Sequence, residues 1–506
     1  MKKSSKTIRQ KTVDSAGESA SNDFMTMAEA IEILKTTRPT FYRWVRAGRI
    51  KATKVGRQWR FRRDDIDRFI QGDAPRIELP VDISPLIRTL REKIGNPGLA
   101  DALRDLPKTT SLVAEAVTLM IAAGVATKSG AVHITTHSAD ARSIGLVRCR
   151  IDGVLHTMAE FDVRLLPGIV EEWKRMASCD VREKTKPQDG RIQIGICGTT
   201  ADLRVNILPA FLGESVTARI LDPGAVNIDI QRMGFAPAEI ERLRRILKNP
   251  SGLIVVTGPT GSGKTTTLYG CLNALAGSEL KIMSVEDPVE YILPWVTQVG
   301  INQAAGLTFP YFLRAILRAD PDVVLIGEIR DLETLSIAQQ VALTGHVVLT
   351  SLHTDGAAAA LRRMVDVGSN PFVVGDATKL VIGQRLVRRL CPHCSARETP
   401  SRDALDEAVA LSDAGGLKWD DLPRRFAKPV GCDRCNLTGF RGRAVVGEML
   451  EMTPEIAKAL REDATAGELT AIAVKQGMTT MAADGIRRAA AGETSLGEVL
   501  RLFGKR

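Results

Sequence analysis

Long hydrophobic runs are missing from this chain. None of its 506 residues belong to an uninterrupted apolar stretch of the roughly 18 residues that a membrane-spanning helix needs. Met1-Lys-Lys is followed by polar residues and not by the apolar segment of a secretory signal peptide. We also find no internal repeat at the periods of solenoid proteins. These absences argue against membrane spans, a leader peptide and a repeat array, and they predict a cytoplasmic globular protein of three or four domains.

Net charge is nearly absent from most of the chain. The formal net charge is +10, and residues 1–76 hold 18 Lys and Arg against 9 Asp and Glu. The other 430 residues are therefore close to neutral. The basic excess belongs to an N-terminal module and not to the chain as a whole.

One glycine-rich segment carries the clearest chemical signal. Leu253-Ile-Val-Val-Thr257 predicts a buried strand, and Gly258-Pro-Thr-Gly-Ser-Gly-Lys264-Thr265 follows it directly. This is the GxxxxGK[ST] phosphate-binding loop in its required context, and a chance match is the alternative. Lys264 would neutralise the β- and γ-phosphates of a nucleotide, and the Thr265 hydroxyl would reach Mg²⁺. The predicted binding residues are Gly258, Pro259, Thr260, Gly261, Ser262, Gly263, Lys264, Thr265 and Thr266.

Three further apolar runs end in polar residues. Lys281-Ile-Met-Ser-Val-Glu286 and Val323-Val-Leu-Ile-Gly-Glu328 end in acids, and Val347-Val-Leu-Thr-Ser-Leu-His353 ends in a histidine. Continuous β-branched runs predict strands that are buried on both faces, as in a parallel sheet covered by helices. The chemistry of such sheets lies at the carboxyl ends of the strands. Glu286, Glu328 and His353 are therefore predicted to meet the phosphate-binding loop at one edge.

Four of the eight cysteines form two CxxC pairs, Cys391-Pro-His-Cys394 and Cys432-Asp-Arg-Cys435. Four thiolates in paired turns suit tetrahedral Zn²⁺. Two disulfides or a redox pair are the alternatives. We expect a zinc site, with His393 as a bystander. Cys149, Cys179, Cys197 and Cys271 are isolated, and we interpret them as small core residues.

The N-terminal module has a pattern of its own. Thr26-Met-Ala-Glu29 predicts a capping box that opens a helix with Ala28, Ile31 and Leu34 inward. Residues 38–46 predict a second helix, residues 50–55 and 58–62 predict a hairpin around Gly56-Arg57, and residues 64–70 predict a short third helix.

A helix-turn-helix with a basic wing resembles the excisionase-type DNA-binding domain. In such a domain one helix faces the major groove and the wing faces the phosphates. Arg38, Thr40 and Arg43 would face the groove, and Lys54, Arg57 and Arg60 would face the phosphates. A docking module or a solvated basic surface is the alternative.

Several long motifs also carry a resemblance. They are Glu286-Asp-Pro-Val-Glu290-Tyr, Gly306-Leu-Thr-Phe with Leu313-Arg314 and Leu317-Arg318, Ile326-Gly-Glu328-Ile-Arg-Asp331, Thr344-Gly-His346 and Ser351-Leu-His353-Thr. These segments resemble the Asp box, Walker B segment and His box of the secretion-motor ATPases. The likeness runs from about Ser111 to the C-terminus. Relatives of the assembly type also carry a tetracysteine insertion.

The resemblance implies roles for individual residues. Glu328 would orient Mg²⁺ or its water, and Glu286, with Glu290 as second choice, would polarise the attacking water. Arg204 and Arg219, in segments similar to the family's N-terminal domain, would reach the nucleotide, with Arg314 and Arg318 as further candidates. His346 and His353 would sense the γ-phosphate. The chain departs from the family at Ser129-Gly-Ala-Val-His133-Ile, where the acid of the usual Ala-Ser-Asp-Ile-His-Ile stretch is absent.

We therefore expect an α/β protein with five parts. These are a disordered basic tail (1–22), a winged helix-turn-helix domain (23–72), a linker (73–107), a smaller PAS-like α/β domain (108–232) and a RecA-like P-loop ATPase domain (233–506) with a zinc insertion at about 391–440.

The expected function is an ATP-hydrolysing motor for type IV pilus or type II secretion pseudopilus assembly. Its cofactors would be ATP, Mg²⁺ and Zn²⁺, and it would form a homo-hexamer. It would act in the cytoplasm, or at the inner membrane through a platform protein, and it would contact duplex DNA through residues 23–72. The alternative is a DNA-responsive ATPase or regulator that uses the motor fold.

Overall fold

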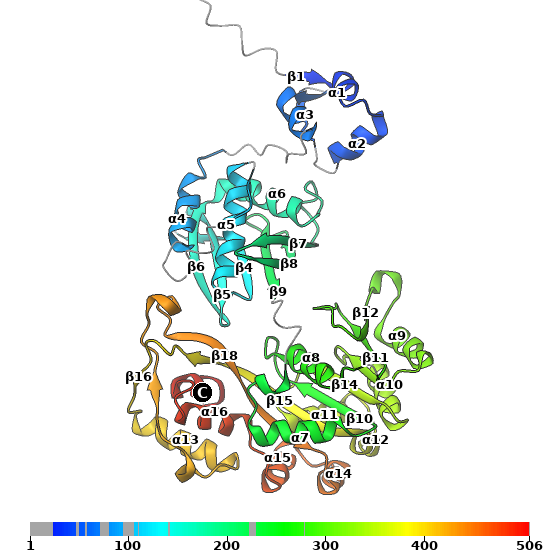
Figure 1. The fold of residues 1–506 in the computed structure, drawn as a ribbon, viewed down its shortest axis with the longest axis vertical. Helices are drawn as coiled ribbons and strands as arrows, with labels where there is room; N and C mark the ends of the chain where they lie inside the picture. The colour runs from blue at the N-terminus through cyan, green and yellow to red at the C-terminus, as the bar shows by residue number, and fades with distance from the viewer. Residues whose placement is uncertain are drawn as a thin grey trace, which may run out of the picture. The chain divides into compact units, whose positions relative to one another are not determined.

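The computed structural model describes residues 24–46, 50–55, 58–70, 80–94, 106–109, 111–139, 142–221, 229–277 and 279–504. It divides into two compact units, Met1–Ile220 and Leu221–Arg506 (Figure 1). The predicted tail, residues 1–22, lies outside the described residues. Among the described helices, none combines the length and hydropathy that a membrane span requires.

The first unit begins with the expected helix-turn-helix and hairpin. Its elements are β1 (Phe24–Thr26), α1 (Met27–Ile33), α2 (Arg38–Arg46), β2 (Thr53–Val55), β3 (Gln58–Arg62) and α3 (Arg63–Ile70). Strands β2 and β3 pair antiparallel, which confirms the hairpin. Strand β1, which the sequence did not predict, pairs with the other edge of β3.

The capping box of α1 is confirmed, but its predicted inward face is wrong at Ala28. Thr26 Oγ1 accepts from the Glu29 N–H at 3.3 Å, and Glu29 Oε2 accepts from the Thr26 N–H at 2.6 Å. Ala28 is exposed and Ala30 is buried. The reason is that β1 fixes the start of the helix against β3, which turns Ala30 toward Phe41 and Phe61 in the core.

The predicted linker contains a helix, so that prediction is wrong. Helix α4 (Ser84–Ile94) lies inside residues 73–107, and it buries Leu86, Ile87, Leu90 and Ile94 in the core of the α/β domain. Prolines suggested a linker, but Pro85 is the second residue of the helix, where a missing N–H costs no hydrogen bond.

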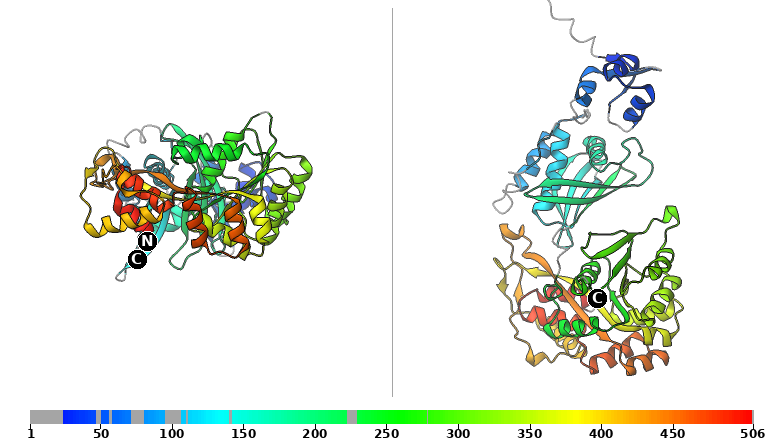
Figure 2. Two further views of the ribbon diagram at one scale, coloured as in Figure 1. Left: turned by 90° about the horizontal axis from the view of Figure 1, so that it is seen from below. Right: turned by 45° about the vertical axis from the view of Figure 1, so that its right-hand side comes forward.

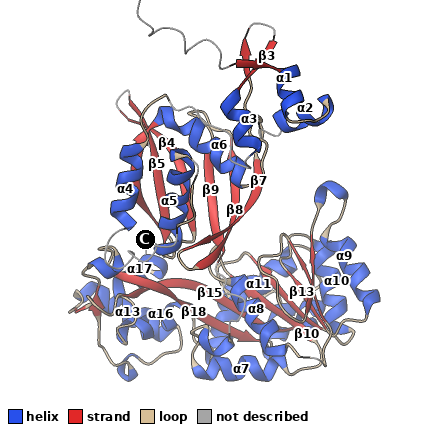
Figure 3. Cartoon of the chain, turned by 45° about the horizontal axis from the view of Figure 1, so that its top comes forward, coloured by secondary structure: helices blue, strands red, loops and turns tan. Residues whose placement is uncertain are grey.

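A six-stranded antiparallel sheet forms the α/β domain. Its strands are β4 (Ala131–Ala139), β5 (Arg142–Ile151), β6 (Val154–Asp162), β7 (Gln188–Ile196), β8 (Thr199–Leu208) and β9 (Ser215–Leu221), in the order β6-β5-β4-β9-β8-β7. Helices α4, α5 (Leu112–Ala126) and α6 (Leu166–Met176) cover one face (Figure 3). The core lies between this face and the helices.

The second unit contains the predicted parallel sheet. Its strands are β10 (Gly252–Thr257), β11 (Ile282–Glu286), β12 (Val296–Gly300), β13 (Val323–Ile326), β14 (Val347–Leu352), β15 (Thr378–Leu390) and β18 (Phe440–Glu451). The order is β12-β11-β13-β14-β10-β15-β18, and only β18 runs antiparallel to its neighbour among these seven.

Helices lie on both faces of this sheet (Figure 2). One face carries α7 (Pro237–Leu247) and α8 (Lys264–Leu275). The other carries α9 (Phe309–Ile316), α10 (Leu332–Leu343), α11 (Ala357–Asp366), α12 (Pro371–Ala377), α14 (Pro454–Arg461) and α15 (Ala466–Lys475). Strands β10, β11, β13 and β14 are buried along their whole length, as the sequence predicted.

The boundary between the α/β domain and the parallel-sheet domain falls earlier than expected. The sequence placed it after residue 232, but the second unit begins at Leu221, and Ile230 already packs in the core beside α7 and α8. The apolar Ile230, which the sequence analysis left in the preceding domain, belongs to this core together with Met233.

The segment between β15 and β18 forms a small lobe with the C-terminal helices. It contains β16 (Ala396–Arg397), α13 (Arg402–Ala414) and β17 (Ala427–Lys428). Helix α13 packs against α16 (Met481–Ala490) and α17 (Leu496–Phe503) in a common apolar core. The predicted folded excursion between the CxxC pairs is therefore confirmed.

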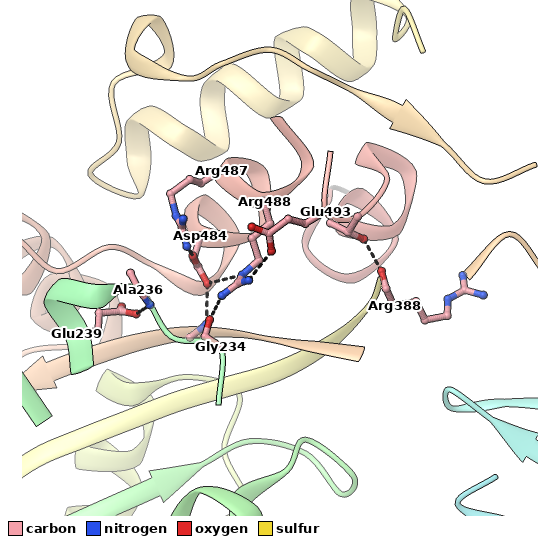
Figure 4. Close-up of polar contacts among 10 residues, drawn as sticks. Gly234, Ala236, Glu239, Arg388, Asp484, Arg487, Arg488 and Glu493 are labelled. Carbon is pink, nitrogen blue, oxygen red and sulfur yellow. Dashed lines mark hydrogen bonds and ion pairs between the residues drawn. The ribbon is translucent and has the colours of Figure 1, made fainter. Parts of the chain in front are cut away.

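A buried polar cluster ties α16 to the start of the second unit (Figure 4). Arg488 donates to the Gly234 carbonyl, to Glu493 Oε2 at 2.8 Å and to Asp484 Oδ2 at 3.4 Å. Asp484 also accepts from Arg487 Nε at 3.1 Å. Since Asp484 and Arg488 are almost fully buried, their charges need compensation, which they give each other and receive from Arg487 and Glu493.

Glu239 of α7 lies beside this cluster, and its pKa is strongly shifted. Burial, then repulsion from Asp484, raise its pKa to about 7, against the opposing effects of the Ala236 N–H, Arg487 and Arg242. The Ala236 N–H donates to Glu239 Oε2 at 3.1 Å, and this bond survives if the carboxyl becomes an amide.

Replacing Glu239 should remove a pH dependence of stability. The folded protein keeps the Glu239 proton up to about pH 7, whereas the unfolded chain loses it near the ordinary glutamate pKa of 4.5. The free energy of unfolding should therefore fall as pH rises through this window and then level off. Glu239→Gln should abolish this slope and stabilise the unit above pH 7 by on the order of 2 kcal/mol.

Urea unfolding between pH 5 and 8 measures this effect, with the exposed Glu241→Gln on the same helix as the control. An identical pH slope in wild type and Glu239→Gln would contradict the assignment.

Candidate active site and cysteine cluster

The glycine-rich loop has the backbone that its sequence demands. It joins β10 to α8, and Gly258, Gly261 and Gly263 have φ angles of 152°, 79° and 89°. A Cβ on Gly258 would lie 2.3 Å from the Gln384 carbonyl oxygen. Both the left-handed backbone and the close approach therefore require glycine.

The Lys264 side chain folds back onto the glycine-rich loop and contacts its backbone carbonyls. Its Nζ donates to the Gly258 carbonyl at 2.8 Å and the Pro259 carbonyl at 3.2 Å, and lies 3.4 Å from His353 Nδ1. Burial lowers the pKa of Lys264, and Glu328 partly offsets this effect. The buried Ser262 hydroxyl has no hydrogen-bond partner in the described structure. An ammonium group and an unpaired hydroxyl inside a glycine loop fit the oxygens of a phosphate.

A buried amide from β15, the neighbour of β10 in the sheet, fixes the loop, and the sequence analysis did not predict it. Gln384 of β15 donates to the Ser262 carbonyl at 2.8 Å and accepts from Thr267 Oγ1 at 2.8 Å. Its side chain is fully buried. A lone glutamine after the apolar run Leu380-Val-Ile-Gly383 was the signal that could have identified it.

Glu328 and His353 meet Lys264 at the carboxyl edge of the sheet, as predicted. His353 Nε2 lies 3.0 Å from Glu328 Oε2, and Arg330 forms an ion pair with the other carboxylate oxygen. Ser351 Oγ donates to the Gly327 carbonyl at 2.7 Å and so joins the ends of β14 and β13. His353 thus contacts Lys264 on one side and Glu328 on the other.

Glu286 lies at the end of β11 with its carboxylate already engaged. It accepts hydrogen bonds from the Tyr269 hydroxyl, from Ser284 Oγ at 2.6 Å and from Gln298 Nε2 at 3.1 Å. The side chain is 4% exposed. Glu286 thus faces α8, and it would have to exchange one of these donors to contact water. Glu290, in the loop after β11, is half-buried.

The structure does not bring His346 to this edge. His346 precedes β14, whereas His353 follows it, so the two side chains lie at opposite ends of a strand of six residues. At about 3.3 Å per residue they are roughly 20 Å apart. The expectation that both contact the same phosphate must therefore be corrected: within one chain, only His353 is at the loop. His346 Nδ1 lies 3.1 Å from the Val341 carbonyl oxygen.

The four arginines of the predicted site lie on other elements. Arg314 of α9 pairs with Glu333 at 2.6 Å, and Arg318 donates to the Arg314 carbonyl at 2.8 Å. Arg204 of β8 and Arg219 of β9 belong to the first unit. Their strand neighbours point into the helix-covered core, so both arginines lie on the sheet face opposite the helices.

The four predicted cysteine ligands come together. Their sulfur atoms all lie within 4.8 Å of one another. The distances are 4.0 Å for Cys391–Cys432, 3.8 Å for Cys394–Cys435 and 3.7 Å for Cys432–Cys435. A tetrahedral ion with four bonds of about 2.3 Å would place its sulfurs about 3.8 Å apart. All four are free thiols at distances too long for a disulfide.

Backbone amides support the sulfur cluster. Gly431 donates to Cys394 Sγ at 3.4 Å, and Cys432 and Gly439 each donate to Cys435 Sγ at 3.2 Å. Burial raises the pKa of Cys435, but the Cys432 and Gly439 N–H groups and the Cys432 and Cys394 side chains outweigh it and lower the pKa to about 7, whereas burial raises the pKa of Cys394 to about 11. Such amides favour the thiolates that bind metal ions. His393 lies 3.0 Å from Arg434 Nη1 and is not part of the cluster.

The predicted DNA-contacting residues lie on α2 and the hairpin. Arg38 and Arg43 are exposed on α2, whose opposite side buries Phe41 and Val45. Thr40 is half-buried and accepts from Thr37 Oγ1 at 3.0 Å. On the hairpin, Lys54 is exposed and Arg60 is half-buried, while Arg57 lies outside the described residues.

Two protein families match this chain. Residues 107–501 match the family described as "Type II/IV secretion system protein", and residues 24–74 match the family described as "Helix-turn-helix domain". The first match covers most of the chain and both motor domains. The second coincides with the winged module.

Individual relatives agree with the first match. The chain is 38% identical over 427 residues to "Type II secretion system protein E" of Klebsiella pneumoniae, covering 82% of each chain. It is 36% identical over 441 residues to "Type IV pilus assembly ATPase PilB" of Myxococcus xanthus, covering 87% of this chain and 75% of the relative.

Solved structures support the fold. The ATPase DotB of Legionella pneumophila is 20% identical with a TM-score of 0.55, covering 78% of this chain and 97% of DotB. The pilus retraction motor PilT with bound ADP is 21% identical with a TM-score of 0.51, covering 76% of this chain and 96% of PilT.

Proposed function

The chain belongs to the family of type II/IV secretion system proteins and is an ATPase of that family, and we propose that it powers the assembly of a type IV pilus or a type II secretion pseudopilus. The observation that carries this proposal is the contact of Lys264, His353 and Glu328 beside the glycine loop. Hydrolysis of ATP would be coupled to movement of the two motor domains.

The carboxyl edge of the sheet would hold the nucleotide and Mg²⁺. Residues 258–266 would surround the phosphates, with Lys264 exchanging its carbonyl partners for phosphate oxygens. The exposed Thr265 hydroxyl and the Glu328 carboxylate offer the oxygen ligands that Mg²⁺ prefers. Bound Mg²⁺ supplies charge neutralisation at the phosphates.

Glu286 and Glu328 would have separate roles at this edge of the sheet. Glu286 is our first choice for polarising the attacking water, with Glu290 second, because Glu286 ends the strand next to β13. Glu328 would position Mg²⁺ or its water. His353 touches both Lys264 and Glu328, so it is placed to report on occupancy of the γ-phosphate position.

Arginines would complete the site. A guanidinium fork matches the three oxygens of a transferring phosphoryl group. Arg204 and Arg219 are the first candidates, and Arg314 and Arg318 are the second. Arg204 and Arg219 belong to the first unit, whereas Arg314 and Arg318 belong to the same unit as the loop. The assembly that we propose is a homo-hexamer.

The tetracysteine lobe would bind one Zn²⁺. The sulfur separations and the three amide hydrogen bonds support this proposal. Because the lobe packs on α16 and α17, the ion would stabilise the C-terminal helices as well as the insertion.

The winged helix-turn-helix module would bind duplex DNA. Arg38, Thr40 and Arg43 on α2 would approach the major groove, and Lys54, Arg57 and Arg60 would approach the phosphates. A partner at the inner membrane, a platform protein, would link the motor to its filament. The second candidate function, a DNA-responsive ATPase, is favoured by the basic charge of residues 1–76.

Lys264→Ala should abolish ATP turnover, because it removes the charge at the β- and γ-phosphates. Glu328→Gln should still bind ATP but turn it over at least about 10²-fold more slowly, as expected for a lost positioned group. Steady-state ATPase assays measure both. The exposed pair Lys458 and Glu462 provides the controls Lys458→Ala and Glu462→Gln. Full activity in Lys264→Ala or Glu328→Gln would refute the site.

Elemental analysis should find about one Zn per chain after purification under reducing conditions. Cys391→Ser and Cys432→Ser should lose the metal and melt at a lower temperature, because the binding energy of a structural zinc is folding energy. Cys197→Ser, which lies outside the cluster, should keep it. Metal-free wild-type protein of undiminished stability would rule out the zinc site.

The full chain should bind duplex DNA with a strong salt dependence, because binding releases counterions from several phosphates. Lys54→Ala should weaken binding to all sequences and reduce the salt slope, whereas Arg43→Ala should flatten any sequence preference. Fluorescence anisotropy at two salt concentrations measures this, with the exposed Arg389→Ala as the control. No binding at low salt would end the DNA proposal and favour a docking module.

A further inference from the structure

Tyr269 is a buried tyrosine of α8 to which the proposed mechanism gives no role. Its side chain is 1% exposed. Helix α8 begins at Lys264, and side chains four residues apart on a helix lie on the same side, one turn from each other. Tyr269 is therefore one turn further along α8 than Thr265, the residue proposed to bind Mg²⁺. The helix thus presents a phosphate-binding turn and a buried phenol on the same side.

The Tyr269 hydroxyl joins three segments of the second unit. It donates a hydrogen bond to Glu286 Oε2 at the end of β11. Hydrogen bonds from the backbones of Tyr291 and Glu290 reach it from the loop after β11. The Tyr269 and Tyr291 rings also pack edge to face, with their centroids 6.3 Å apart. One hydroxyl therefore connects the phosphate-binding helix with the segments that carry both candidate glutamates.

The other donors to Glu286 hold the second oxygen of its carboxylate. Ser284 Oγ and Gln298 Nε2 donate to Oε1 at 2.6 Å and 3.1 Å, whereas Oε2 accepts only from Tyr269 within the described structure. Gln298 makes the longer of these two bonds and is half-buried on β12, the edge strand of the sheet. It is therefore the donor that an incoming water molecule can replace. The buried Ser284 and Tyr269 then keep the carboxylate in place.

The phenol of Tyr269 is a permanent donor near neutral pH. Burial, then the charge of Glu286 and the hydrogen bond to it, raise the pKa of Tyr269, and the two backbone hydrogen bonds offset this only in part. A hydroxyl that keeps its proton donates continuously and so fixes the direction of the oxygen that accepts from it. Polarising a water molecule requires a carboxylate in a fixed position.

We propose that Tyr269 is a positioning residue for ATP hydrolysis: its hydroxyl holds Glu286 in one orientation, so that the carboxylate accepts a hydrogen bond from the attacking water when Gln298 leaves. Tyr269 contacts neither nucleotide nor water in this scheme. It acts through Glu286 and couples that carboxylate to the helix that carries Lys264 and Thr265. This inference rests on the proposed ATPase function and on Glu286 as the group that polarises water.

Tyr269→Phe keeps the ring and its packing and removes only the hydroxyl. Because the variant loses a hydrogen bond to a charged group, kcat should fall at least about tenfold. The affinity for a non-hydrolysable ATP analogue should stay within about twofold of wild type, since the phenol does not contact the nucleotide. Steady-state ATPase assays and calorimetry measure the two quantities. Tyr311→Phe, at an exposed position on α9, is the control and should match wild type in both.

A double-mutant cycle shows whether Tyr269 acts through Glu286. In the slower Glu286→Gln protein, adding Tyr269→Phe should reduce kcat by less than about a further twofold, because residues that act together do not contribute additively. In the Glu290→Gln protein the full loss should remain. A packing defect would instead lower kcat equally in both backgrounds. A full further loss on top of Glu286→Gln, or a loss that disappears only in Glu290→Gln, would overturn the proposal.

The same assays separate this inference from the proposed function. Turnover by wild type that is lost in Lys264→Ala establishes the ATPase function independently of Tyr269. An active wild-type protein whose Tyr269→Phe variant keeps the wild-type kcat would refute the role of Tyr269 alone. Wild-type protein without turnover that depends on Lys264 would refute the proposed function and this inference with it.

Discussion

The ATPase site depends on one buried amide, that of Gln384. A glycine-rich loop has many accessible backbone conformations, and it needs an external contact to keep a single one. Gln384 supplies that contact by holding the Ser262 carbonyl and the Thr267 hydroxyl together. Because the Gln384 carbonyl also lies against Gly258, one residue of β15 determines both ends of the loop.

The same strand connects the phosphate loop to the cysteine cluster. Strand β15 ends at Leu390, Cys391 follows it immediately, and the chain returns along β18 after Cys435. The glycine-rich loop thus lies beside the middle of β15, and the cysteine cluster lies at the end of β15 where the chain leaves for the lobe. Arg388 of β15 also pairs with the buried Glu498 of α17 at 2.7 Å. The lobe is therefore built on the strand that shapes the active site.

Much of this arrangement could be predicted, because motifs with strict backbone requirements leave few alternatives. The glycine loop, the buried parallel strands and the CxxC pairs each specify their own local geometry. Contacts between distant segments were not predictable in the same way. Gln384 is an ordinary residue in sequence, and α4 was hidden by prolines, although Pro85 is the second residue of the helix. His346 directly precedes the strand that the sequence predicted and His353 directly follows it, so the sequence already held the information that separates the two histidines. The roles of Glu286 and of the arginines stay predictions, since they depend on a bound nucleotide.

The affinity of Gln384→Ala for a non-hydrolysable ATP analogue tests this account most directly. The variant leaves the Ser262 carbonyl and the Thr267 hydroxyl without partners, and an unsatisfied buried group costs about 1–3 kcal/mol. We predict roughly tenfold weaker binding in isothermal titration calorimetry, with unchanged circular dichroism, and no change for the exposed Gln340→Ala. Wild-type affinity in a correctly folded Gln384→Ala protein would contradict the claim that this amide holds the phosphate-binding loop in its active shape.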